Sequence, residues 1–108
     1  MIETKYIPQE NAEVIYRLLE LCKEKEPNVC FDVLDTEEQV CKSKDSERVL
    51  RDIDGGDEDI GINCFVNGEY LGWFGLFPYE DSESMIYDYS DNEFCKYVYY
   101  KLEKEMKW

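Results

Sequence analysis

The sequence of 108 residues contains no histidine. Histidine is the most frequent general acid–base residue and the usual activator of Ser and Cys nucleophiles, so Ser–His and Cys–His catalytic pairs are excluded. Pairs of carboxylates could still transfer protons, but among 26 Asp and Glu residues some pairs will be close by chance. No phosphate-binding loop of the GxxxxGK type is present. We therefore expect a protein that is not an enzyme and carries no cofactor.

Long apolar runs and cysteine pairs are also missing. No stretch approaches the roughly 18 apolar residues of a membrane span, and the opening residues, MIETKYIPQE, lack the apolar run of a signal peptide. The five cysteines are an odd number with no CxxC pair, which indicates reduced, buried side chains rather than disulfides or a zinc site. These observations predict a cytoplasmic protein that does not associate with membranes.

Basic residues are absent from the middle of the chain. Residues 52–93 contain twelve Asp and Glu but no Lys or Arg, so this segment carries −12 of the net charge of −14. Such a field repels nucleic acids and anionic membranes and attracts basic partners. We expect the partner to be a basic protein, and we expect no direct binding to nucleic acid.

What is present suffices for one domain spanning 1–108, because 44% of the residues are hydrophobic. Apolar residues at helical spacing predict a helix over 9–25 that stops before Pro27. Alternating β-branched and aromatic residues predict a strand at 29–34, with Val29, Phe31 and Val33 on one face.

The next segment is ambiguous. The sequence TEEQ at 36–39 resembles a capping box and predicts a short helix from Glu37. A second helical segment is predicted around 45–53, either as a continuation of the first or as a separate helix.

The strongest local pattern is IGINCFVNGEYLGWFGLF at 60–77, where Asn67-Gly68 separates two hydrophobic runs as in a type I′ hairpin. Counting back from this turn predicts four cross-strand pairs: Val66–Glu69, Phe65–Tyr70, Cys64–Leu71 and Ile62–Trp73. The residues predicted for the core face are Ile60, Ile62, Cys64, Leu71 and Trp73. The residues predicted to open the other face to a helix or another chain are Gly61, Gly72 and Gly75.

A further strand is predicted at 84–90, and a second capping box, Ser90 to Glu93, predicts the start of a last helix that ends near Lys107. The apolar side of this helix is formed by Phe94, Cys95, Val98, Tyr99, Leu102 and Met106. The predicted fold class is α+β. A small antiparallel sheet contains the hairpin 60–77, the strand near 84–90 and, as a further candidate, the strand 29–34. The first and last helices pack on one face of it.

The loop DIDGGDED at 52–59 holds five carboxylates in eight residues. A calcium loop of the EF-hand type needs Gly at its sixth position, but that position is Asp57 when counted from Asp52, and Ile62 when counted from Asp57. The loop is then a solvated turn that bends at Gly55-Gly56, a cation site of another geometry, or a surface that meets a positive partner.

Tyrosines and acids alternate after the hairpin. Each tyrosine by itself fits a residue that covers the core while its hydroxyl reaches water. Together they indicate an aromatic and acidic binding surface, because Tyr gives a large contact area at a small entropic cost. The residues predicted to contact the partner are Asp52, Asp54, Asp57, Glu58, Asp59, Tyr79, Glu80, Asp81, Glu83, Tyr87, Asp88 and Tyr89.

The resulting hypothesis is a small acidic inhibitor that acts by stoichiometric binding and occupies the nucleic-acid-binding surface of a nuclease or related effector. Anti-CRISPR and antirestriction proteins that imitate DNA offer an analogy of size and charge. Carboxylates in the loop would lie on the order of 5 Å apart, within a factor of two of the roughly 3.4 Å per charge along one DNA strand. The alternatives are an immunity protein that neutralises a nuclease toxin, a small enzyme or divalent-metal-binding module, and a domain whose acids only keep it in solution.

Overall fold

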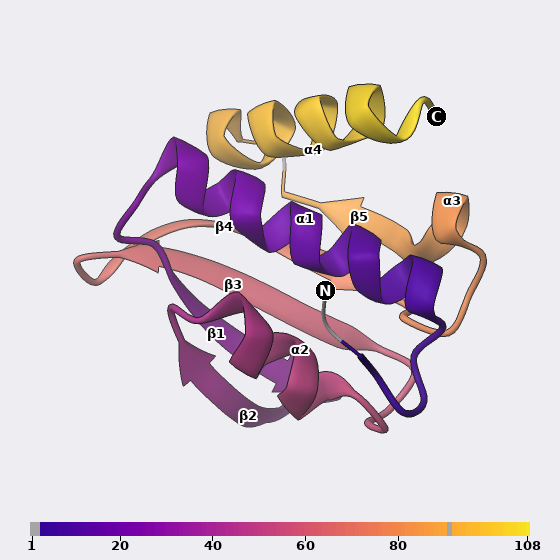
Figure 1. The fold of residues 1–108 in the computed structure, drawn as a ribbon. Coiled ribbons are helices and arrows are strands. Elements are labelled where there is room, and N and C mark those ends of the chain that lie inside the picture. The colour runs from indigo at the N-terminus through magenta and orange to yellow at the C-terminus, as the bar shows by residue number, and fades with distance from the viewer. Residues whose placement is uncertain (1–2, 91) are drawn as a thin grey trace.

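The computed structural model describes residues 3–90 and 92–108, which form two layers: a β-sheet, and helices packed on one of its faces (Figure 1). The sheet is antiparallel, with strand order β2-β1-β3-β4-β5. The elements are α1 (Gln9–Lys25), β1 (Cys30–Asp35), β2 (Glu38–Ser43), α2 (Ser46–Ile53), β3 (Ile60–Val66), β4 (Glu69–Leu76), α3 (Ser82–Met85), β5 (Ile86–Tyr89) and α4 (Glu93–Met106). The predicted α+β class, with the first and last helices on the sheet, is confirmed.

The core lies between the helices and the sheet, because alternate strand residues point toward the helices. The predicted face of β1 is confirmed, since Val29, Phe31 and Val33 are fully buried. The predicted helix over 9–25 is confirmed as α1. No helix in the described part of the chain is long and apolar enough to cross a membrane.

The helix predicted from Glu37 is wrong. Residues 36 and 37 form a tight turn in which Thr36 has a φ of 61°, and the chain then returns as the edge strand β2. A capping box is a local signal only, and pairing with β1 gives the backbone groups of this segment more partners than one helical turn would. The segment predicted around 45–53 does form a helix, α2, and the Asp45 carboxylate caps it by accepting from the Glu47 N–H at 3.0 Å.

The predicted hairpin is confirmed near its turn and wrong beyond it. Asn67 and Gly68 have φ values of 51° and 80°, and the pairs Val66–Glu69 and Phe65–Tyr70 are present. The register then shifts at a β-bulge, so Cys64 pairs with Gly72 and Ile62 pairs with Phe74. One extra residue in a strand moves every following side chain to the other face.

The bulge corrects two face predictions and leaves a third in place. Leu71 is half-buried and packs against the core as predicted, but Trp73 is not on the core face of β4, which buries Phe74 and Leu76 instead. Gly72 lies on the core face rather than the open one, where a Cβ would come within 2.5 Å of Cys95 Sγ of α4. The absence of a side chain at position 72 therefore lets α4 approach the sheet.

The last strand and helix begin later than predicted. Residues 84 and 85 belong to α3, and β5 starts at Ile86. The cap of α4 is Asn92, whose side chain accepts from the Cys95 N–H at 3.0 Å, and not Ser90. The Ser90 hydroxyl instead accepts from the Trp73 N–H at 2.9 Å, which ties the start of the helix to β4. Position 91 of the predicted capping box lies outside the described residues.

Candidate protein-binding surface

One end of the sheet is marked by a row of paired residues at the strand ends. The register aligns Glu38, Asp35, Ile60, Leu76 and Ile86 across the five strands. Three connections close this end: the turn 36–37, the loop 54–59 and the segment 77–85, which includes α3. None of these connections contains a Lys or Arg.

The same connections and strand ends gather acids that are far apart in the sequence. Ten carboxylates lie here, and we call them the acidic end: Asp35, Glu37, Glu38, Asp54, Asp57, Glu58, Asp59, Glu80, Asp81 and Glu83. Eight of them are exposed, whereas Asp35 and Asp54 are half-buried. Strand pairing therefore produces a concentration of negative charge that no single loop has.

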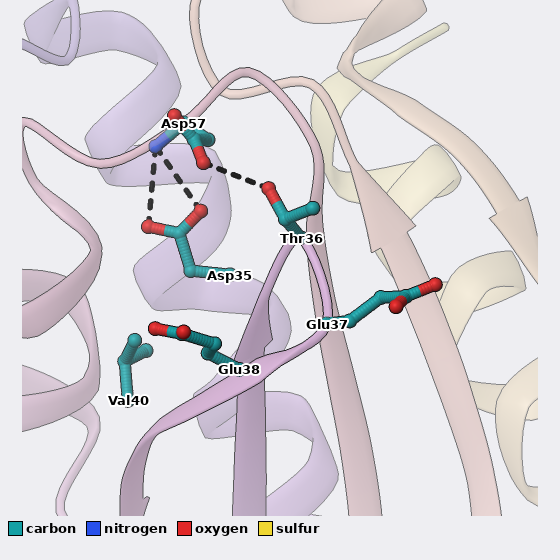
Figure 2. A pocket seen from close by; sticks show the side chains of 6 residues that line it. All are labelled: Asp35, Thr36, Glu37, Glu38, Val40 and Asp57. Carbon is teal, nitrogen blue, oxygen red and sulfur yellow. Dashed lines mark hydrogen bonds between the residues drawn. The ribbon is translucent and has the colours of Figure 1, made fainter.

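Hydrogen bonds tie the turn 36–37 to the loop 54–59 (Figure 2). The Asp57 N–H donates to both carboxylate oxygens of Asp35 at 3.2 Å, and the Thr36 hydroxyl donates to Asp57 Oδ2 at 2.7 Å. Burial raises the pKa of Asp35 and the charges of Asp57 and Glu38 add to the rise, although the Asp57 N–H opposes it. The fold thus holds several like charges together around a shallow hollow, which Glu38 also lines.

Asp54 has a different role, because it fixes the N-terminal segment. Its carboxylate accepts from the backbone N–H groups of Lys5, Tyr6 and Ile7 at 2.6, 3.0 and 2.9 Å. Burial acts to raise the pKa of Asp54, but these three donors and the Lys5 charge lower it overall. Much of the hydrogen-bonding capacity of this carboxylate is therefore already used within the chain.

The segment 77–85 is held by two polar side chains. The Tyr79 hydroxyl donates to the Gly56 carbonyl at 3.1 Å and accepts from the Gly55 N–H at 3.0 Å. The buried amide of Asn11 donates to the carbonyls of Pro78 and Glu80 at 2.8 and 2.6 Å. This segment and the loop 54–59 are consequently fixed relative to each other, so their exposed acids form a preorganised array.

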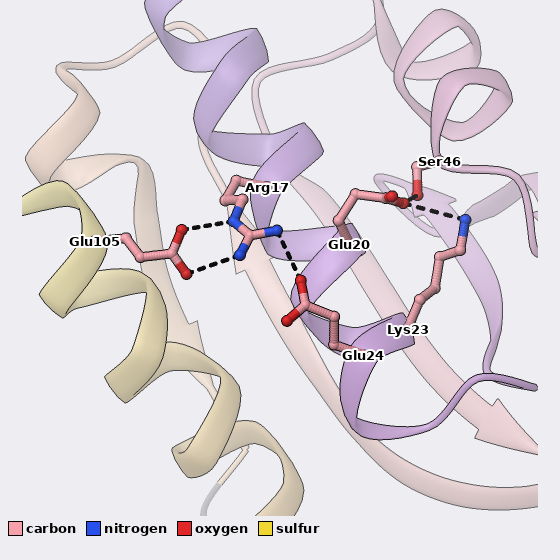
Figure 3. Close-up of polar contacts among 6 residues, drawn as sticks. All are labelled: Arg17, Glu20, Lys23, Glu24, Ser46 and Glu105. Atoms are coloured by element: carbon pink, nitrogen blue, oxygen red, sulfur yellow. Dashed lines mark hydrogen bonds and ion pairs between the residues drawn. The ribbon is translucent and has the colours of Figure 1, made fainter.

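Three cations of α1 and α2 are paired with carboxylates outside the acidic end. Arg17 of α1 binds Glu105 of α4 at 2.6 Å and Glu24 at 2.8 Å, and Lys23 lies 3.1 Å from Glu20, as Figure 3 shows. A further ion pair joins Arg48 and Asp52 within α2 at 3.5 Å. None of these pairs includes a carboxylate of the acidic end.

Aromatic side chains lie on the open face of the sheet, which no helix of the described residues covers. Tyr87 of β5 is 42% exposed and stacks on Phe77 with a centroid distance of 4.2 Å, and its edge meets Trp73 at 6.4 Å. We call these three residues the aromatic cluster. A second pair on this face, Phe65 and Tyr70, has a centroid distance of 5.5 Å.

The aromatic cluster is joined to the acidic end by one hydrogen bond. The Tyr87 hydroxyl donates to Asp59 Oδ1 at 2.7 Å. Burial, this hydrogen bond and the charges of Asp59 and Asp88 raise the pKa of Tyr87 to about 12, so the phenol stays protonated at neutral pH. Acids and aromatic rings therefore form one continuous surface at this corner of the sheet.

The structure brings most of the sequence-predicted site residues together. The residues at the acidic end or beside it on the open face are Asp54, Asp57, Glu58, Asp59, Tyr79, Glu80, Asp81, Glu83, Tyr87 and Asp88. Two are placed elsewhere: Asp52 lies on α2, and Tyr89 faces the helices, where it stacks on Tyr99 of α4 at 4.4 Å.

Sequence reasoning missed two groups. Asp35, Glu37 and Glu38 were overlooked because the segment after β1 was assigned to a helix, although the run DTEE beside a predicted strand was a usable signal. Trp73 and Phe77 were missed as surface residues because the bulge in β4 reverses the faces expected from simple alternation.

Among the described residues, no group of three or more Cys, Asp or Glu is arranged to hold a metal ion. Comparisons of the chain with protein-family models, with curated proteins and with solved structures find no match.

Proposed function

We propose that this protein is a stoichiometric inhibitor whose acidic end occupies the basic, nucleic-acid-binding surface of a partner protein. The observation that supports this most directly is the convergence of ten carboxylates, eight from three connections that contain no Lys or Arg and two from the adjoining strand ends. Fixed acids at one end of a rigid sheet can substitute for phosphates on a basic surface, and their field accelerates encounter.

The energetics of the fold support the same proposal. Like charges around Asp35 and Asp57 repel, so gathering them costs stability. The hydrogen bonds of Thr36, Tyr79 and Asn11 hold these connections in place despite that repulsion. A cationic partner would relieve this repulsion on binding. All five cysteines are free, which supports a reducing compartment such as the cytoplasm as the place of this encounter.

The test compares two variants that each lose four negative charges. The acidic-end variant carries Asp57→Asn, Glu58→Gln, Glu80→Gln and Asp81→Asn. The matched control carries Glu47→Gln, Glu69→Gln, Glu93→Gln and Glu103→Gln, all at exposed positions outside the acidic end. Asp35 and Asp54 stay unchanged because they accept backbone hydrogen bonds.

Proteins captured from host cells by the wild-type chain are identified by mass spectrometry, and their association kinetics are measured with all three forms. The acidic-end variant should bind at least about ten-fold more slowly at low salt with a weaker salt dependence, whereas the control should differ by less than about two-fold. The partner should bind a labelled DNA or RNA duplex, and an equimolar amount of this protein should displace it. Equal binding by both variants, or simultaneous binding of protein and duplex, would overturn the proposal.

A further inference from the structure

The residues on the open face of the sheet define the chemistry of any ligand that binds there. Two aromatic rings of the cluster stand over Gly75, where a Cβ would lie 2.5 Å from Tyr87 Cζ and 2.8 Å from Trp73 Cζ3. Without a side chain at this position, both rings approach the strand backbone closely and meet edge to face at an interplanar angle of 70°. A glycine in the neighbouring strand, Gly61, is paired with Gly75 and extends the low floor across β3.

The charge of this face decides between a second copy of the chain and another partner. On the open face of the described strands, Lys42 is paired across the sheet with Asp32, so its charge is matched. Beside the aromatic cluster, the charges of Asp88 and of Asp59 at the sheet end have no basic residue near them on the strands. Packing two such faces against each other would place like charges together without compensation. The complementary occupant is a cationic segment of another protein.

We propose that the aromatic cluster is a docking site for arginine side chains of the basic partner, a refinement that rests on the proposed function. A guanidinium group stacks on aromatic rings and binds carboxylates with paired N–H donors, whereas an ammonium group stays more strongly hydrated. The cluster offers both interactions. Tyr87 and Phe77 supply the ring surface, and Asp59 keeps Oδ2 available because only Oδ1 accepts from Tyr87. Asp88 adds a second charge within electrostatic range of Tyr87.

Two synthetic peptides of equal length and charge, nona-arginine and nona-lysine, test this at about 0.1 M salt, where long-range attraction is already partly screened. The wild-type chain should bind the arginine peptide about three-fold or more tightly than the lysine peptide, as expected for a partly exposed cation–π contact. In a two-dimensional NMR spectrum, only the arginine peptide should shift the indole N–H resonance of Trp73. Trp108 provides an internal reference, because it follows the end of α4 and packs against the core rather than joining the aromatic cluster.

Variants separate the ring from its hydroxyl. Tyr87→Leu should abolish the preference for arginine and leave lysine binding unchanged, and Phe77→Leu should reduce the preference in the same direction. Tyr87→Phe should retain most of it. The control is Tyr100→Leu on α4, a tyrosine that is 53% exposed and already has Lys104 Nζ 4.5 Å from its ring centroid; it should have no effect.

The outcomes distinguish this inference from the proposed function. Equal affinity for the two peptides, or an arginine preference that survives Tyr87→Leu, overturns arginine docking at the cluster. If neither peptide binds, the inference also fails, while the proposed function is judged separately by the acidic-end variant and the natural partner. If the chain self-associates in sedimentation and Tyr87→Leu abolishes that association, the occupant is a second copy and the inference is wrong.

Discussion

Replacing Asp54 by Ala should destabilise the fold, although it removes one of the crowded negative charges. The carboxylate accepts three backbone N–H groups of residues 5–7 at 2.6–3.0 Å, and these bonds position Ile7, which is 2% exposed, in the core. Each such bond contributes about 1 kcal/mol at a partly solvated site, so the loss should be about 2–3 kcal/mol. Asp54→Asn retains one acceptor oxygen, so its free energy of unfolding should fall by about half as much.

Asp35→Asn is the matched control at the same end of the sheet. The Asp35 carboxylate also accepts a backbone N–H, that of Asp57, and an amide oxygen can still do so. Because burial and neighbouring charges disfavour its ionised form, removing its charge should leave the free energy of unfolding unchanged or higher. Two carboxylates about equally exposed and both bonded to backbone amides should therefore respond in opposite directions.

The pH dependence of stability follows from the direction in which folding shifts the pKa of each carboxylate. The pKa of Asp54 is lowered in the folded state, so its contribution is present above its unfolded pKa of about 3.9 and is lost as the pH falls through the folded value. The pKa of Asp35 is raised, so its ionised carboxylate destabilises the folded state at neutral pH. This destabilisation disappears as the pH falls through that raised value.

Urea denaturation of wild type, Asp54→Ala and Asp35→Asn between pH 3 and 7 measures these differences. The difference in the free energy of unfolding between wild type and Asp54→Ala should become smaller below about pH 4. At neutral pH it should correspond to a fall in melting temperature of about 8–12 °C for a domain of this size. A loss under about 0.5 kcal/mol for Asp54→Ala, or a difference constant from pH 3 to 7, would refute the reasoning.

Three further predictions concern the surface charge and two glycines. A mobility-shift assay at about 0.1 M salt should show no complex with DNA or RNA at micromolar protein, and any complex would contradict the charge argument. Gly68→Val should lower the free energy of unfolding by more than about 1 kcal/mol, because a β-branched residue is strained at the φ of 80° found there; an unchanged melting temperature would count against the turn. Gly72→Ala should lower it by about 2 kcal/mol or more and weaken hydrogen-exchange protection in the first turn of α4, since the new Cβ would meet Cys95 Sγ at 2.5 Å; wild-type protection would contradict the close approach.

Local patterns predicted the parts of the fold that local chemistry decides. The spacing of apolar residues defined α1, and Asn67-Gly68 defined the turn between β3 and β4. The two errors at helix starts share a cause. At both 36–39 and 90–93 a hydroxyl residue three positions before Glu or Gln resembled a cap, but tertiary pairing used the Thr36 and Ser90 hydroxyls elsewhere.

Only part of the acidic end could be predicted, because its composition depends on tertiary pairing. A run of acids is visible in any sequence, so the loop at 52–59 could be found directly. Its union with Asp35, Glu37 and Glu38 depends on which strands are neighbours, and no local pattern encodes the pairing of β1 with β3. Tyr89 was assigned to the same surface as Tyr87, because residues two apart on a regular strand share a face, but a register shift between β4 and β5 turns the two side chains to opposite faces.

The extra residue in β4 separates the length of the strand from the faces of its side chains. Leu71 has no partner on β3, so deleting it would leave the pairs beyond the turn unchanged: Asn63 would still pair with Trp73, and Ile62 with Phe74. Only closing the bulge with Leu71 kept in the ladder, so that Cys64 paired with Leu71, would turn Trp73 to the interior and Phe74 to solvent. The aromatic cluster above Gly75 therefore tolerates the loss of one residue at position 71, because the bulge holds that residue outside the pairing.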